Sequence, residues 1–143
     1  MDSVLFPGKL DSLSPIRERV NKASADAGLD ADAAYKLALA IDEIATNIIL
    51  HGYEEHGKSG DVAVYIDRPP GELVVTLEDT AVPYDPKTRK LPTETDLSKP
   101  LEDREIGGLG VYLAIQGVDR FDYEYVNGKN RNIFGMKLGG KAK

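Results

Sequence analysis

Apolar side chains alternate with other residues in several short stretches of this sequence, which is the pattern of half-buried β-strands. The first stretch ends at Pro7-Gly8, a pair that interrupts a strand. The next two are joined by Arg68-Pro69-Pro70-Gly71 and the last two by Asn127-Gly128, so each pair predicts a hairpin. The expected strands lie at residues 3–6, 62–66, 73–77, 121–125 and 133–136.

In two further stretches, apolar residues recur every three or four positions, which predicts helices. The first helix is expected to start at Ser14-Pro15, a capping hydroxyl followed by a first-turn proline, and to end at Gly28. The second is expected to start at Asp30 or Asp32 and to run to Gly52. It is apolar on more than one face, so we expect it to be buried against a sheet. Its apolar positions are Tyr35, Ala38, Ile41, Ala45, Ile48 and Ile49.

A third helix is expected after a long irregular segment, at residues 107–117. The order of elements is then strand, helix, helix, hairpin, long loop, helix and hairpin. This order favours an α+β fold, a two-layer α/β sandwich with helices on one face of a mixed, mostly antiparallel sheet. The length of 143 residues fits one domain over residues 1–143, in which 139–143 form a short basic tail.

Composition narrows the classes of function. Asp and Glu number 24 and Lys and Arg 18, which gives a formal net charge of −6 and disfavours a nucleic-acid partner. No apolar run is long enough to span a bilayer, so no membrane partner is expected. The absence of cysteine excludes disulfides, thiolate metal sites and a cysteine nucleophile. Residues 1–10 do not have the pattern of a signal peptide, which favours a cytoplasmic protein.

Three segments carry polar residues that a plain scaffold does not need. In the second helix, Glu43 and Asn47 are four residues apart and share one face, and His51 falls near the same stripe. Buried polar groups need partners, because an unpaired one costs about 1–3 kcal/mol. The stripe is therefore either a binding surface or the solvated edge of an amphipathic helix.

The second segment begins at Asp79, where a strand runs out into residues 80–105, a stretch with four prolines. Acidic residues at strand ends are commonly turn formers, and so long a loop is either disordered or a functional lid. The third segment is Gly107-Gly108-Leu109-Gly110, at the start of the expected third helix. Bare amides there suit a phosphate group, although glycines also serve tight packing.

Taken together and in this order, the three segments resemble the GHKL ATPase superfamily, with its Bergerat (histidine kinase-like ATPase) fold. Residues 40–53 are similar to the asparagine-box helix of the anti-sigma factor serine/threonine-protein kinase branch, including the His-Gly-Tyr ending. Residues 79–86 and 106–113 resemble its first and second glycine boxes, and 119–138 its terminal hairpin. The resemblance covers residues 3–138.

The resemblance implies an ATP-dependent protein serine/threonine kinase that uses Mg²⁺. Glu43 would be the general base, Asn47 would give its side-chain oxygen to Mg²⁺, and Asp79 would accept a hydrogen bond from the adenine amino group. A lid would cover about residues 80–106, in which Lys99 or Arg104 would neutralise phosphate charge. The other implied nucleotide contacts are His51, Ala81, Tyr84, Arg104, Gly107, Gly108, Leu109 and Gly110.

The implied partners are a small phosphoacceptor protein, the anti-sigma factor antagonist, and a sigma factor, with a homodimer as the common state of the branch. Ala81 departs from the pattern, because the first glycine box normally has glycine there. If the position needed a positive φ, a Cβ would cost about 1 kcal/mol or more, and the methyl would crowd the adenine pocket. The alternative is therefore a catalytically weak or inactive nucleotide-binding module that regulates by binding its partners.

A histidine-kinase-like domain in a phosphorelay is disfavoured, since the chain has only His51 and His56 and no dimerisation helix. His56 is expected to be a plain solvated side chain. The acidic excess is placed partly at the site, through Asp42, Glu43 and Asp79, and partly in the lid. An acidic pocket for a polyanion predicts that binding depends on Mg²⁺.

Overall fold

The structure is a computed structural model that describes residues 2–83, 111 and 114–138. Its strands are β1 (Asp2–Pro7), β2 (Asp61–Asp67), β3 (Glu72–Asp79), β4 (Arg120–Val126) and β5 (Lys129–Lys137). They form one sheet in the order β1-β2-β3-β5-β4. All four pairings are antiparallel, where the sequence analysis expects a mixed, mostly antiparallel sheet.

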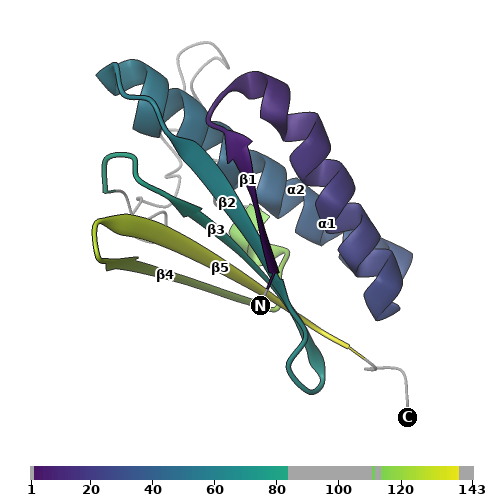
Figure 1. Cartoon of the computed structure of the whole chain (residues 1–143). Helices are drawn as coiled ribbons and strands as arrows, with labels where there is room; N and C mark the ends of the chain where they lie inside the picture. The colour runs from purple at the N-terminus through teal and green to yellow at the C-terminus, as the bar shows by residue number, and fades with distance from the viewer. Residues whose placement is uncertain (1, 84–110, 112–113, 139–143) are drawn as a thin grey trace, which may run out of the picture.

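Both long helices, α1 (Leu13–Ala27) and α2 (Ala31–Asn47), lie on one face of this sheet (Figure 1). The short helix η1 (Leu10–Ser12) precedes α1, and a π-helix, η2 (Ile48–Tyr53), continues α2 into η3 (Glu54–His56). The expected two-layer architecture is confirmed. The core between the layers is formed by side chains that are at most 2% exposed, among them Ile16, Val20, Leu37, Ile41, Ile44, Val64, Leu73, Val75 and Phe134.

The helix ends follow the expected chemistry with one shift. Gly28 closes α1 with a φ of 78°, and Asp30 caps α2 by accepting a hydrogen bond from the Ala33 amide at 2.9 Å. The expected start of the first helix at Ser14-Pro15 is two residues late. Ser12 takes the capping position, but its hydroxyl donates to the carbonyl oxygen of Pro7 at 2.6 Å and ties the helix to β1.

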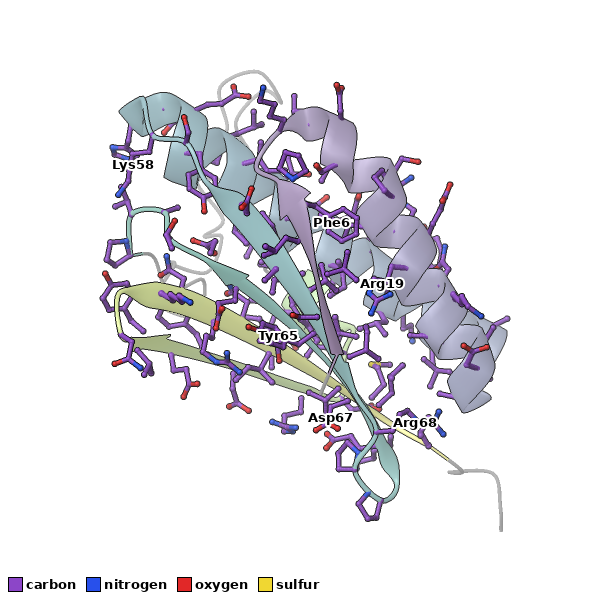
Figure 2. All side chains as sticks on the ribbon, viewed as in Figure 1. Phe6, Arg19, Lys58, Tyr65, Asp67 and Arg68 are labelled. Atoms are coloured by element: carbon purple, nitrogen blue, oxygen red, sulfur yellow. The ribbon has the colours of Figure 1, made fainter. Side chains whose placement is uncertain are left out.

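The second helix packs against the sheet, as expected, but its apolar position Tyr35 is 66% exposed. Because α2 rests on the sheet with one face and on α1 with another, its remaining face is open, and Leu39 is exposed there too. Figure 2 shows the opposite situation for Phe6, which lies between β1 and α1 and is packed against the core. No helix in the described ranges is long and apolar enough to cross a membrane.

Both expected hairpins form. Asn127 and Gly128 have φ of 55° and 76°, as a two-residue turn of the mirror-image type requires, and Gly71 has a φ of 75°. The β2–β3 turn, marked by Asp67 and Arg68 in Figure 2, lies at one end of the sheet. Lys58 marks the other end, where η2 and η3 meet the first residues of β2 and the last of β3.

Candidate functional site

A cavity of about 220 Å³ lies at the end of the sheet that is opposite the β2–β3 turn. It is enclosed by the end of α2, by η2, by the last residues of β3 and by the first residues of β5. Ligand pockets usually measure roughly 300–1,000 Å³, so the described walls enclose a group the size of a base rather than a whole nucleotide. The polar residues on these walls are Asn47, His51, Glu55, His56, Asp79, Asn130 and Asn132.

Asp79 is the last residue of β3 and is only 2% exposed. Its Oδ1 accepts hydrogen bonds from the Ala81 amide and from the side-chain amide of Asn130, both at 2.9 Å. Its Oδ2 has no hydrogen-bond partner among the described residues. Burial raises the pKa of Asp79, although the bonds from Asn130 and Ala81 partly oppose the rise, and nearby Glu78 adds to it. One carboxylate oxygen is thus fixed and the other is left for a donor.

Asn130 holds this arrangement from β5, because β3 and β5 pair Asp79 directly with Asn130. Its side-chain nitrogen also donates to the Ala81 carbonyl oxygen at 3.1 Å, and its Oδ1 accepts from the Tyr123 hydroxyl of β4. The segment after β3 is therefore fixed to the strand beside it.

A Cβ at position 81 is expected to be costly only if the backbone there has a positive φ. Asn127 is the one residue other than glycine with a positive φ in the described part of the chain, so the backbone at Ala81 does not need glycine. The Ala81 methyl is buried above Gly52, where an added Cβ would lie 2.7 Å from it. Ala81 therefore lines the cavity and fits because its neighbour in η2 has no side chain.

Tyr53, the last residue of η2, joins the helix to the strand ends. Its buried hydroxyl donates to the Asp61 carbonyl oxygen at 2.8 Å and accepts from the Thr80 amide at 2.9 Å. Burial is the main cause that raises the pKa of Tyr53. Glycines fit around its ring, since a Cβ at Gly8 or Gly60 would approach it to 2.8 or 2.7 Å.

On α2 and η2, Asn47 and His51 both line the cavity, as their shared stripe predicts. Glu43 is half-buried one turn earlier and is not among the described residues that line the cavity. Asp42 is also not among the described residues that line the cavity. Its carboxylate faces α1 and pairs with Arg17 at 2.9 Å, because a residue next to Glu43 points about 100° away around the helix.

His51 Nδ1 lies 2.7 Å from Glu55 Oε2, so a carboxylate orients the imidazole at the cavity mouth. His56 is exposed, as expected, but it also contributes to the rim of the cavity. Within the described ranges, no group of three or more His, Asp or Glu side chains could hold a metal ion by itself.

A family model described as the histidine kinase-like ATPase domain matches residues 6–137. The chain belongs to this family. The described fold is that of a histidine kinase-like ATPase domain, and one carboxylate, Asp79, is buried in the wall of its cavity.

Two relatives in sequence are named serine-protein kinase RsbW. The one from Halalkalibacterium halodurans is 28% identical over 85% of this chain and 74% of that protein. The one from Bacillus thuringiensis is 30% identical over 76% of this chain and 67% of that protein.

Solved histidine kinases share the fold. A histidine kinase domain from the Erythrobacter litoralis EL346 blue-light activated histidine kinase aligns with a TM-score of 0.51 and 18% identity over 89% of this chain. The blue-light activated kinase itself aligns with a TM-score of 0.56 and 17% identity over 92%. This chain spans 61% and 43% of the length of those two structures, less than two-thirds in both cases.

Several expected site residues of this histidine kinase-like ATPase domain lie outside the described residues. They include residues 84–106 of the expected lid, with Lys99, most of the second glycine box, and the six remaining nucleotide contacts. Those contacts are Tyr84, Arg104, Gly107, Gly108, Leu109 and Gly110.

Sequence reasoning missed four residues of the site: Tyr53, Glu55, Asn130 and Asn132. A signal for the two asparagines was present, because they occupy the same face of the last strand as Phe134 and Met136. Two amides in line with a buried apolar pair are unusual on the core face of a strand. For Tyr53, no local pattern in the sequence distinguishes a tyrosine whose hydroxyl bonds the strand ends from an ordinary aromatic residue of the core.

Proposed function

We propose that this protein is an ATP-dependent serine/threonine protein kinase of the anti-sigma type, which phosphorylates a small antagonist protein in a partner-switching pathway. The observation that carries the proposal is the unpaired Oδ2 of buried Asp79, in a cavity that Asn47 also lines. Membership of the histidine kinase-like ATPase family and similarity to proteins named RsbW support it.

The described walls would enclose the adenine base, and the phosphates with their metal ion would lie beyond it. Asp79 Oδ2 would accept a hydrogen bond from the amino group of adenine, and a guanine would place its carbonyl oxygen against the same carboxylate. The side-chain oxygen of Asn47 is the hard ligand that Mg²⁺ takes. Bound Mg²⁺ would neutralise phosphate charge.

Phosphoryl transfer depends mainly on positioning and charge stabilisation. Glu43 would accept the proton from the serine or threonine hydroxyl that attacks the terminal phosphate, from its place one turn before Asn47 on α2. The described walls carry no Lys or Arg, so the metal would supply the positive charge that this part of the site lacks. We propose, accordingly, that binding depends on Mg²⁺.

Isothermal titration with Mg-ATP, followed by transfer of radiolabelled phosphate to a candidate antagonist protein, tests the proposal. Wild type and Glu43→Gln should bind ATP alike, while Glu43→Gln should lose most of the transfer. Glu18→Gln, an exposed change on α1, serves as the matched control and should transfer as wild type does.

Each negative result has a distinct meaning. Absence of ATP binding by wild type would overturn the proposed function altogether. Tight binding without transfer would favour the alternative, a nucleotide-binding module that acts by holding its partners. Equal transfer by wild type and Glu43→Gln would remove the general-base role of Glu43.

A further inference from the structure

The cavity holds a second buried polar group without a partner, the side-chain oxygen of Asn132. Asn132 is 2% exposed, lines the cavity and lies on the inner face of β5, two residues from Asn130. Its Oδ1 makes no hydrogen bond with any described residue. Leaving such a group unpaired is costly, so its retention on a core face points to a ligand.

Asn132 lies deeper in the sheet than Asp79. In the β3–β5 register, Asp79 is opposite Asn130, and Asn132 is opposite Leu77, the next inward-facing residue of β3. Asp79 Oδ2 and Asn132 Oδ1 are therefore two free acceptors on neighbouring strands that line one cavity. Ile44 and Ile48 of α2 and η2 line the same cavity and provide apolar surface for a flat ring.

We propose that Asn132 is a specificity-determining residue that reads the edge of the adenine base together with Asp79. The amino group of adenine has two N–H donors, so it can serve both free acceptors. The Asn132 amide also carries a donor beside its acceptor, which matches the amino group and ring nitrogen N1 of adenine. This inference rests on the proposed ATP binding.

The two residues have separate tasks in this scheme. An amide can turn over and present its donor and acceptor in either order, so Asn132 alone would accept adenine or guanine. Asp79 cannot, because Asn130 and the Ala81 amide occupy its Oδ1 and its Oδ2 only accepts. Asp79 thus fixes which purine enters, and Asn132 adds affinity for the purine that carries both the amino group and N1.

The test measures affinities of the full chain, with Mg²⁺ present, for ATP and for 1-deaza-ATP, which lacks the N1 acceptor. Wild type should bind 1-deaza-ATP roughly tenfold more weakly than ATP, the effect of one lost hydrogen bond. Asn132→Leu, of similar size but without polar atoms, should bind ATP about 10- to 100-fold more weakly and should not distinguish the two ligands. Asn132→Ala gives the same comparison if the leucine variant does not fold.

Asn21→Leu, an exposed change on α1, is the matched control and should behave as wild type. The inference is overturned if wild type binds ATP and 1-deaza-ATP equally, or if the Asn132 variants keep the wild-type ratio. Either result would mean that a water rather than the base satisfies Asn132. Absence of ATP binding by wild type is a different outcome, which overturns the proposed function and this inference with it.

Discussion

The contact between Gly52 and Ala81 gives the sharpest test of how the cavity is built. A Cβ added at Gly52 would lie 2.7 Å from the Ala81 methyl, whereas carbon atoms in contact prefer about 3.5–4.0 Å. About 1 Å of overlap must then be absorbed. Ala81 cannot easily move, because Asp79 holds its amide and Asn130 holds its carbonyl. Overpacking of this kind costs about 1–3 kcal/mol.

The magnitude follows from two opposing effects. An alanine is favoured over glycine by about 1 kcal/mol within a helix, so Gly52→Ala should lower the free energy of unfolding by a net value of about 0–2 kcal/mol. Ala81→Gly alone loses a buried methyl, about 0.8 kcal/mol, and gains backbone freedom, about 0.4–1 kcal/mol. In the double variant the overlap is absent, so its stability should exceed the sum of the single effects by about 1–3 kcal/mol.

Urea denaturation of the four proteins at one pH gives this coupling energy directly. Gly117→Ala is the control, because an added Cβ there meets its nearest neighbour at 3.5 Å, an ordinary contact. Gly117→Ala should combine additively with Ala81→Gly. If Gly52→Ala and Ala81→Gly are also additive within about 0.5 kcal/mol, the methyl groups at positions 52 and 81 do not compete for the same space and the predicted overlap is wrong.

Three further predictions concern neighbouring groups. Asp79→Asn should abolish most ATP binding in titration and yet stabilise the fold at neutral pH. Because the pKa of Asp79 is raised on folding, the protonated side chain contributes stability below the unfolded pKa near 3.8, and this contribution is lost as pH rises through the folded pKa. The stability advantage of Asp79→Asn over wild type should therefore grow over that rise in pH. A difference in the free energy of unfolding that does not change with pH would show that burial does not raise the pKa of Asp79. Tyr53→Phe should lower the free energy of unfolding by about 1–3 kcal/mol, because the Asp61 carbonyl and the Thr80 amide both lose their hydrogen bonds to the Tyr53 hydroxyl; a loss under about 0.5 kcal/mol would show that water replaces the hydroxyl. Asp42→Ala should change stability by less than about 1 kcal/mol and leave ATP affinity unchanged, because the pair with Arg17 is solvent-exposed; weaker ATP binding would place Asp42 at the site after all.

The sequence alone predicts most of the fold, because the signals that define it are local. Strand alternation and the Asn127-Gly128 turn yield both hairpins, and Gly28 with Asp30 marks where one helix ends and the next begins. Tyr35 is the exception among the helix positions. Its burial depends on which faces of α2 are covered, and a periodic pattern cannot decide that for a helix apolar on several faces.

Spacing along the chain predicts site residues only where they are close in sequence, and Asp79 is predicted from the family resemblance instead. Asn47 and His51 are one turn apart, so their meeting at the cavity follows from helix geometry. Asn130 meets Asp79 through the register of two strands that are 51 residues apart in the chain, which no local pattern specifies. For Ala81, the fit in the fold depends on the backbone φ and on the space left by Gly52, and neither follows from the residue type alone.

The inner face of β5 carries two kinds of buried residue, apolar side chains that form the core and amides that line the cavity. Phe134 and Met136 continue the core, and toward the start of the strand the same face carries Asn132 and Asn130, still buried. An apolar residue of similar size in place of Asn132 would pack there without an unpaired oxygen, and its burial would then add stability in place of a desolvation cost. Asp79, which lies opposite Asn130 on β3, also carries a desolvation cost, as its raised pKa shows. Because folding gains nothing from either free oxygen, their position in one base-sized cavity is best explained by a bound ligand that donates hydrogen bonds to both.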